Sequence, residues 1–229
     1  MPERTESERT ELTRSVRFEK TDILRMFPSF VWKAELARGV FQPMNAALIA
    51  ALGEIGAPLS SLRPEQSWQS PHDLHERAPF RALIDCVQAA AQGALSYLKV
   101  SHAGILVSGC WANVNAPGAA HPEHSHPNNY LSGVYYVRTP PGADTIDFHD
   151  PRPQAGIVRP PVTALTAENT DEVVVRVTEG TLLLFPAWLC HSVDANASQE
   201  LRISFSFNLM FRSYAETMAR PLWEPGTRS

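Results

Sequence analysis

The chain has 229 residues, of which 44% are hydrophobic and 19% are charged, and it carries a net charge of -4. This composition is typical of a globular protein, and the length allows one large domain with a full core. The acidic balance lacks the basic footprint of nucleic-acid-binding proteins, so we expect no nucleic-acid partner. No apolar run reaches the roughly 18 residues that suggest a membrane span, so we expect none.

The first residues, MPERTESERTELTR, are strongly charged and contain no apolar stretch. This pattern does not resemble a secretory signal peptide. We expect a disordered tail at residues 1–14 and a single domain over residues 15–229. Cys86, Cys110 and Cys190 are widely spaced and form no CxxC pair. An odd number of isolated cysteines argues against a disulfide framework and favours a cytoplasmic location.

The helical signals lie between about residues 40 and 100. The stretch PMNAALIAALGEIG begins with Pro43 and ends with Gly56, which predicts a helix that starts at the proline and stops at the glycine. The stretch RAPFRALIDCVQAAAQGALSYLKV has apolar residues three and four apart, which predicts a second helix. The segment between the two helices has the composition of a loop.

From about residue 104 to residue 212 the signal changes to short strands separated by turn residues. A Pro-rich segment, HDPRPQAGIVRPPVTALTAENT, is expected to form a long surface loop, and such loops are often functional. Strands after helices predict a mainly β fold, an antiparallel sandwich or barrel with a helical annex. The strand-like stretches are ILVSGCWANVN, LSGVYYVRT, TIDFHDP, EVVVRVTEG, TLLLFP, LCHSVDA and LRISFSFNLMF.

Three of the eight histidines lie close together in HPEHSHPNNYLSGVYYV, which starts at His121. His124 and His126 are one residue apart, so on an extended chain both imidazoles point to the same face. His191 follows a strand-like stretch much later in the sequence. A barrel could bring His124, His126 and His191 around one metal ion. We expect His121 to be a loop residue rather than a ligand, although it could line the entrance of the site.

Arg202 and Ser204 share one face of the strand LRISFSFNLMF, downstream of His191. A guanidinium binds a carboxylate through two parallel hydrogen bonds. Three protein ligands leave coordination positions open, as non-haem Fe(II) oxygenases require. An arginine beside a serine therefore suits the far carboxylate of 2-oxoglutarate. Asn113 and Tyr136 are further cofactor-binding candidates, although neighbouring backbone could also satisfy the asparagine.

Several stretches, in order from Phe27 to Asn208, resemble the 2-oxoglutarate- and Fe(II)-dependent oxygenases of bacteria and phages that carry an HxHP motif before an SGVYY strand. The resemblance implies a double-stranded β-helix, the jelly-roll or cupin-like barrel, which uses Fe(II), O2 and 2-oxoglutarate as co-substrate. The resemblance does not imply a substrate. Our leading hypothesis is a hydroxylase that releases succinate and CO2 and acts on an unactivated C–H bond of a small-molecule or amino-acid-like substrate. The stretches are FPSFVWKAEL, SWQSPHDL, CWANVNAPGAAHPEHSHPNNYLSGVYYV, IDFHDPR, TLLLFPAWLCHSV and LRISFSFN.

The chain departs from the wider superfamily in one position, because His126 stands where a carboxylate is usual. Spacing favours His126 as a ligand over Glu123 or Asp150, although a β-bulge could alter which side chains face the metal. Two other hypotheses remain open. One is a three-histidine, cupin-like dioxygenase that does not use 2-oxoglutarate, and the other is a non-catalytic, ligand-binding jelly roll. The sequence also leaves a homodimer open.

Overall fold

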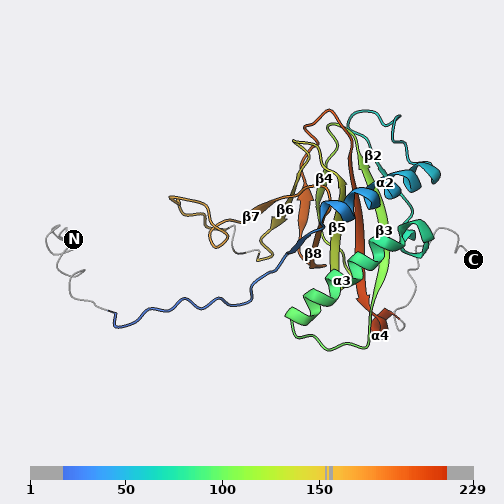
Figure 1. Cartoon of the computed structure of the whole chain (residues 1–229). Helices are drawn as coiled ribbons and strands as arrows, with labels where there is room; N and C mark the ends of the chain where they lie inside the picture. Colours follow the sequence, from blue (N-terminus) through green and yellow to red (C-terminus); the bar gives the residue numbers. More distant parts are fainter. Residues whose placement is uncertain (1–17, 153, 155–156, 216–229) are drawn as a thin grey trace, which may run out of the picture.

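The computed structural model describes residues 18–152, 154 and 157–215 (Figure 1). The tail expected at residues 1–14 lies outside the described residues. All seven strand-like stretches form strands, and β1, β2 and β4 are additional. The strands are β1 (Trp32–Glu35), β2 (Ser67–Gln69), β3 (Ile105–Asn115), β4 (His121–His124), β5 (Leu131–Arg138), β6 (Thr145–His149), β7 (Glu172–Arg176), β8 (Thr181–Pro186), β9 (His191–Val193) and β10 (Arg202–Phe211). The helices are α2 (Arg38–Glu54), α3 (Arg81–Tyr97) and α4 (Arg212–Ala215), with short 3-10 turns at Leu74–Glu76 and Ala78–Phe80.

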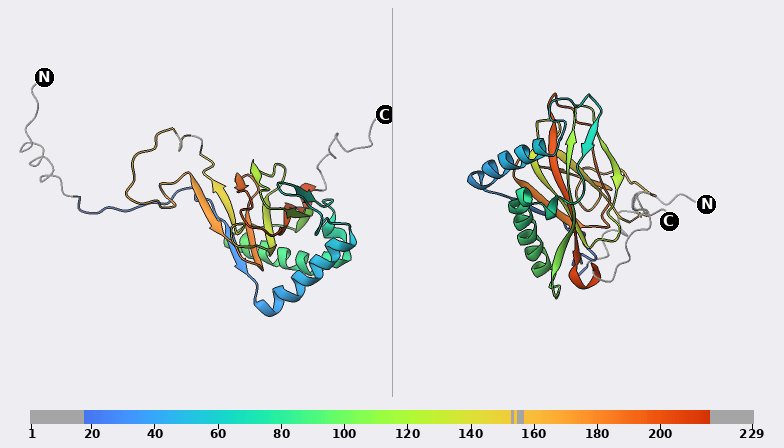
Figure 2. Two further views of the ribbon diagram at one scale, coloured as in Figure 1. Left: turned by 90° about the horizontal axis from the view of Figure 1, so that it is seen from above. Right: turned by 90° about the vertical axis from the view of Figure 1, so that its right-hand side faces the viewer.

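The strands form two antiparallel sheets that pack face to face. The larger sheet has the order β1-β8-β5-β10-β3-β2, and the smaller has the order β4-β9-β6-β7. Apolar side chains of β5 and β8 meet those of β6 in a core between the sheets. Helices α2 and α3 cover the outer face of the larger sheet (Figures 1 and 2). The expected mainly β fold with a helical annex is therefore confirmed.

The strands at the centre of the larger sheet are buried on both faces. Every residue of β5 except Arg138 is buried, which explains the nearly continuous apolar run in its sequence. Tyr135 faces the helices and donates a hydrogen bond of 2.6 Å to Asn45 Oδ1 of α2. Gly133 allows the close packing here, because a Cβ at this position would lie 2.3 Å from the carbonyl oxygen of Leu183.

Helix α2 starts one turn earlier than the sequence predicts. Its first residue is Arg38, and Pro43 lies inside the helix. The backbone N–H groups of Val40 and Phe41 already bond to the carbonyl of Ala37. The assumption that the proline marks the first helical position was wrong, because packing of the helix on the sheet offsets the hydrogen bond that Pro43 cannot donate. The predicted stop at Gly56 is confirmed by its left-handed backbone, with φ of 79°.

The Pro-rich segment between β6 and β7 projects from the body of the molecule (Figure 2). Its described residues contain no strand, and those from Ile157 to Asn169 are exposed. This part of the prediction, a long surface loop, is confirmed. No helix among the described residues is long and apolar enough to cross a bilayer.

Candidate active site

Three histidines come together where the smaller sheet faces the pocket. His124 ends β4 and lies opposite His191, the first residue of β9, in the antiparallel register. His126 follows two residues later, and its backbone N–H bonds to the carbonyl of Ala187 at 2.8 Å. One ring nitrogen from each of the three imidazoles lies within 4.8 Å of the other two. The structure therefore places the three sequence-predicted metal ligands in one cluster.

Backbone carbonyls orient two of these imidazoles. Nδ1 of His124 lies 2.8 Å from the carbonyl oxygen of Pro122, and Nδ1 of His191 lies 2.9 Å from that of Leu189. A carbonyl oxygen only accepts, so each Nδ1 carries the proton and donates it. Each Nε2 keeps its lone pair. Metal-binding histidines are commonly held in this way, with the second ring nitrogen bonded to a carbonyl or carboxylate.

Burial keeps two of the imidazoles uncharged. Burial, together with a smaller effect of the neighbouring His191, lowers the pKa of His126 to about 4. Burial likewise lowers the pKa of His191 to about 4, against the opposing effect of the hydrogen bond to Leu189. A neutral imidazole is the form that binds a metal ion. The donor set, the tautomers and the protonation states thus fit a divalent transition metal.

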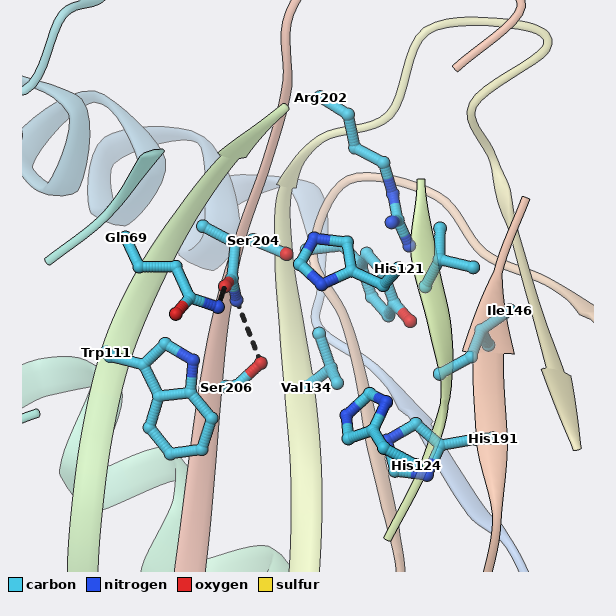
Figure 3. A pocket seen from close by; sticks show the side chains of 13 residues that line it. Gln69, Trp111, His121, His124, Val134, Ile146, His191, Arg202, Ser204 and Ser206 are labelled. Carbon is cyan, nitrogen blue, oxygen red and sulfur yellow. Dashed lines mark hydrogen bonds between the residues drawn. The ribbon is translucent and has the colours of Figure 1, made fainter. Parts of the chain in front are cut away.

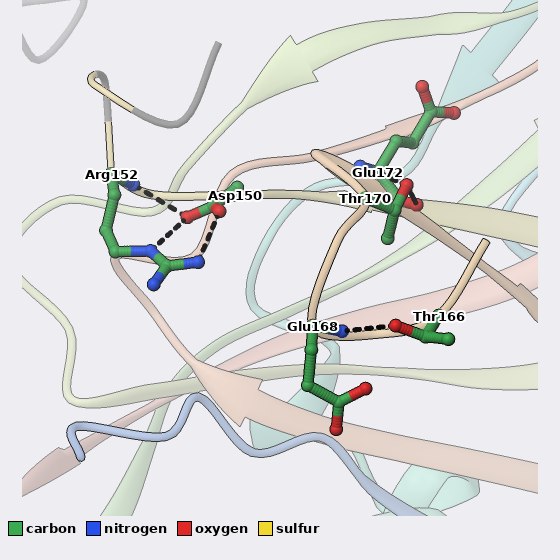
Figure 4. A network of polar contacts seen from close by, with 6 residues as sticks. All are labelled: Asp150, Arg152, Thr166, Glu168, Thr170 and Glu172. Carbon is green, nitrogen blue, oxygen red and sulfur yellow. Dashed lines mark hydrogen bonds and ion pairs between the residues drawn. The ribbon is translucent and has the colours of Figure 1, made fainter. Parts of the chain in front are cut away.

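The two carboxylates considered from the sequence lie apart from the cluster. Asp150 is bound by both arms of the Arg152 guanidinium, at 2.9 and 2.7 Å, and this ion pair holds the pKa of the carboxyl below its usual range (Figure 4). Glu123 accepts a hydrogen bond from the thiol of Cys190, whose pKa is raised by burial and by this carboxylate. Among the described residues, no carboxylate joins the histidine cluster.

A pocket with an empty volume of about 430 Å³, part of it open to solvent, lies between the two sheets (Figure 3). His124 and His191 line one side of it, and residues of β2, β3, β5 and β10 line the opposite side. All four residues predicted to bind the cofactor line the same pocket: Asn113, Tyr136, Arg202 and Ser204.

Arg202 is a buried cation that forms no ion pair among the described residues, although the buried carboxylate of Asp147 lies within electrostatic range of it. The Arg202 side chain is 3% exposed, and it forms none of the ion pairs found among the described residues. One Nη donates to the carbonyl oxygen of Thr145 at 3.2 Å, and Nε has no hydrogen-bond partner among the described residues. Buried charges in proteins are nearly always paired. The unpaired guanidinium therefore points to an anionic ligand.

Tyr136 lies beside this arginine. The guanidinium carbon of Arg202 is 5.4 Å from the centre of the tyrosine ring. The Tyr136 hydroxyl is buried and has no hydrogen-bond partner among the described residues. Burial raises the pKa of this hydroxyl to about 12, so it remains a donor. Buried polar atoms without partners usually mark a missing ligand or water, and here they lie against the same unpaired cation.

The other two cofactor candidates, Ser204 and Asn113, lie opposite each other in the larger sheet. Ser204 is 3% exposed and lies opposite Asn113 and Tyr136 in the sheet register. Asn113 accepts a hydrogen bond of 2.8 Å from Gln69 and donates one of 2.9 Å to Ser206. Side chains, rather than the backbone, therefore supply partners to the Asn113 amide.

Two residues of the pocket lie in strands where the sequence predicted loops. His121 belongs to β4 and lines the pocket, with Nε2 2.7 Å from Nδ2 of Asn115. The expectation of a loop residue was wrong, because β4 pairs with β9, and an irregularity in β4 between His121 and His124 lets both residues face inward despite their odd spacing. Gln69 was placed in a loop, but it lies on β2, which pairs with β3.

The barrel, the histidine cluster and the unpaired arginine together define an Fe(II)- and 2-oxoglutarate-dependent oxygenase. Residues 109–208 match the model of a protein family described as "Putative 2OG-Fe(II) oxygenase". This segment runs from β3 to β10 and contains all three clustered histidines and Arg202. Residues 109–208 are thus similar to the 2OG-Fe(II) oxygenase domain that this model describes, and the resemblance inferred from the sequence is confirmed. No curated protein matches the sequence.

Solved structures show the same fold. The carbocyclase SnoK from nogalamycin biosynthesis superposes with a TM-score of 0.58 at 14% identity, over 80% of either chain. A Pseudomonas putida prolyl-4-hydroxylase gives 0.56 at 13% identity, over 80% of this chain and 94% of its own. HygX from Streptomyces hygroscopicus, with nickel and 2-oxoglutarate bound, gives 0.53 at 11% identity, over 80% and 83%. The double-stranded β-helix fold is therefore confirmed.

Proposed function

We propose that the chain is a 2-oxoglutarate-dependent Fe(II) oxygenase that hydroxylates an unactivated C–H bond of a small molecule. The observation that supports this best is that a histidine cluster and a buried, unpaired arginine line one pocket. A metal and a dicarboxylate are the two ligands that such a pair of features requires. Cytoplasmic location and a homodimer remain predictions.

In this proposal His124, His126 and His191 hold Fe(II). The Nε2 atoms of His124 and His191 face the metal, because their Nδ1 hydrogens are donated to backbone carbonyls. The three side chains come from two adjacent strands of the smaller sheet and the turn that follows β4. Their positions are therefore fixed by the sheet rather than by a mobile loop.

Arg202 binds the far carboxylate of 2-oxoglutarate through Nε and its remaining Nη hydrogens. The Tyr136 hydroxyl and Ser204 hydroxyl donate to the same carboxylate, and Asn113 lines the adjacent wall. Because Arg202 and Ser204 are almost fully buried, water does not compete for these bonds. Residues of the larger sheet thus orient the co-substrate toward the histidines.

When bound, Fe(II) and 2-oxoglutarate supply the oxidation: O2 is consumed, 2-oxoglutarate becomes succinate and CO2, and a C–H bond of the substrate becomes C–OH. The protein contributes binding, orientation and exclusion of water. Apolar side chains of Val134, Ile146 and Val193 line the pocket between the histidines and Arg202. These side chains keep water from the space where the reactive groups meet.

A second candidate is a three-histidine, cupin-like dioxygenase that cleaves its substrate without 2-oxoglutarate. The absence of a carboxylate from the cluster among the described residues favours it. The unpaired Arg202 favours the first proposal, because the far carboxylate of 2-oxoglutarate gives that buried cation an anionic partner. The match to the family model argues against the third hypothesis, a non-catalytic jelly roll.

Succinate formation tests the proposal directly. The purified protein, reconstituted with Fe(II), is exposed to O2 with and without 2-oxoglutarate in the presence of candidate small molecules. We expect succinate in stoichiometric proportion to hydroxylated product, and no product when 2-oxoglutarate is omitted. Product formation without 2-oxoglutarate would support the cupin-like candidate instead.

A further inference from the structure

The pocket has a closed end and an open end. Arg202 and Ser204, at the closed end, are each 3% exposed. Further along the same face of β10, Ser206 is half-buried. Gln69 lies on the edge strand β2, in register with Asn113 and Ser204, and it is exposed. The pocket wall is therefore closed at Arg202 and Ser204 and opens toward Ser206 and Gln69. Because the proposed function places 2-oxoglutarate at the closed end, the substrate must enter from the open end.

The open end contains no charged side chain. Arg202 is the sole Lys or Arg among the residues that line the pocket, and none of them is Asp or Glu. The histidines that line the pocket lie on β4 and β9, across the pocket from β2 and β3. Apart from Arg202, the walls formed by β2, β3, β5 and β10 therefore offer no charged side chain to a substrate.

A directed series of amide and hydroxyl groups lines the open end. Gln69 Nε2 donates to Asn113 Oδ1 at 2.8 Å, and Asn113 Nδ2 donates to Ser206 Oγ at 2.9 Å. This direction leaves Gln69 Oε1 as a free acceptor at one end and the Ser206 hydroxyl hydrogen as a free donor at the other. Trp111 forms the adjoining wall and is stacked on His72, with ring centres 4.4 Å apart.

We propose that this open end is the substrate site and that it binds an uncharged, hydrogen-bonding part of the substrate, one that bears hydroxyl or amide groups. Gln69 is the specificity-determining residue, because it presents a free acceptor to the substrate. The proposal rests on the proposed function. It narrows the amino-acid-like substrates expected from the sequence to those that are uncharged at this position. An ammonium or carboxylate group placed there finds no side chain of opposite charge.

Gln69→Glu supplies a sharp test because it changes charge with little change in size. The glutamate can be accommodated if the Asn113 amide turns over and the Ser206 hydroxyl becomes a donor to it. The variant places a carboxylate at the open end and should favour amines. Gln66→Glu is the matched control: Gln66 is exposed, accepts a bond from the backbone N–H of Arg63, and does not line the pocket.

The experiment uses the full chain loaded with Mn(II) and 2-oxoglutarate, in which the paramagnetic ion accelerates proton relaxation of nearby molecules. The probes are matched triplets, each a neutral compound with its amine and carboxylate counterparts: glucose, glucosamine and glucuronate, and N-acetylglycinamide, glycinamide and N-acetylglycine. We expect the neutral members to relax fastest and to bind at least about tenfold more tightly than their charged counterparts, as expected for an unpaired charge. Gln69→Glu should shift the preference to the amines, and Gln66→Glu should leave the ranking unchanged.

The proposal would be overturned if the protons of the charged probes relaxed as fast as those of the neutral probes in the unsubstituted protein. It would also be overturned if Gln69→Glu left the order of the probes' relaxation rates unchanged. A third contrary result would be fast relaxation of the 2-oxoglutarate protons without faster relaxation of any probe. If Mn(II) does not accelerate the relaxation of the 2-oxoglutarate protons themselves, the co-substrate does not bind near the metal. That result would overturn the proposed function and, with it, the assignment of the open end.

Discussion

The two sheets that enclose the pocket differ in how well they are covered. In the larger sheet, helices pack on the outer face and β5 and β8 are buried along nearly their whole length. In the smaller sheet, β7 is mostly exposed and β4 is at most half-buried. The candidate metal ligands lie on the smaller sheet or directly after it, and the candidate co-substrate residues lie on the larger one. Stability and metal binding should therefore respond to different substitutions.

Removal of a histidine should have the largest effect. We expect His124→Ala, His126→Ala or His191→Ala each to abolish iron binding, because two imidazoles cannot replace three ligands. The protein should stay folded, since the main core lies on the other sheet. Iron content after anaerobic reconstitution measures the first effect, and circular dichroism the second.

Glu123→Ala is the control for this prediction. Glu123 is exposed and bonds to Cys190 rather than facing the cluster, so iron content should be unchanged. Full iron affinity in His126→Ala would show that the three-histidine assignment is wrong.

Truncation in the larger sheet should unfold the protein far more readily than truncation in the smaller one. Phe205 of β10 is fully buried and packs against Phe80, with ring centres 5.7 Å apart. We expect Phe205→Ala to lower the free energy of unfolding by about 3–5 kcal/mol. Val174→Ala on β7, where the side chain is 57% exposed, should change it by less than about 0.5 kcal/mol. Urea denaturation of both variants provides the comparison, and equal losses would contradict it.

Arg202→Ala should weaken 2-oxoglutarate binding without affecting the metal. A hydrogen bond to a charged group contributes about 1.5–3 kcal/mol, so affinity should fall at least about tenfold. Arg202→Lys should recover only part of this loss, because an ammonium group cannot form the paired bonds of a guanidinium. Isothermal titration of the Mn(II)-loaded protein with 2-oxoglutarate measures the effect. Equal affinity in Arg202→Ala would exclude this residue as the anchor.

Ser204→Ala should have the smallest effect. It removes one neutral donor from the carboxylate, which contributes about 0.5–1.5 kcal/mol. The same titration should show a loss of affinity clearly smaller than that of Arg202→Ala. A larger loss would mean that Ser204, and not the arginine, dominates binding at the closed end of the pocket.

Much of the fold could be predicted from local sequence patterns. Seven of the ten strands in the described part of the chain could be predicted from period-two alternation and turn residues. The stop of α2 could be predicted from Gly56, because glycine readily adopts the left-handed backbone found there. The start of α2 could not be predicted from the sequence, because it depends on packing of the helix against the sheet rather than on Pro43. The short strands β1 and β2 pair with segments distant in sequence, and no local pattern indicates such pairs.

The candidate site, like the fold, could be predicted only in part from the sequence. Spacing and side-chain chemistry correctly grouped His124, His126 and His191, and strand parity grouped Arg202 with Ser204. The role of His121 depends on an irregularity within β4 that reverses its parity, so counting alternate residues from His124 could not show that His121 faces the pocket. Gln69 reaches the pocket because β2 pairs with the edge of β3, a long-range contact that a single sequence does not reveal.

The most direct test of the central claim is an anaerobic titration of the Fe(II)-loaded protein with 2-oxoglutarate. The claim is that the histidine cluster and Arg202 together bind metal and co-substrate in one pocket. The metal-to-ligand charge-transfer band of an Fe(II)–2-oxoglutarate complex should then develop and saturate at one equivalent. Absence of this band in protein with confirmed bound iron would contradict the account.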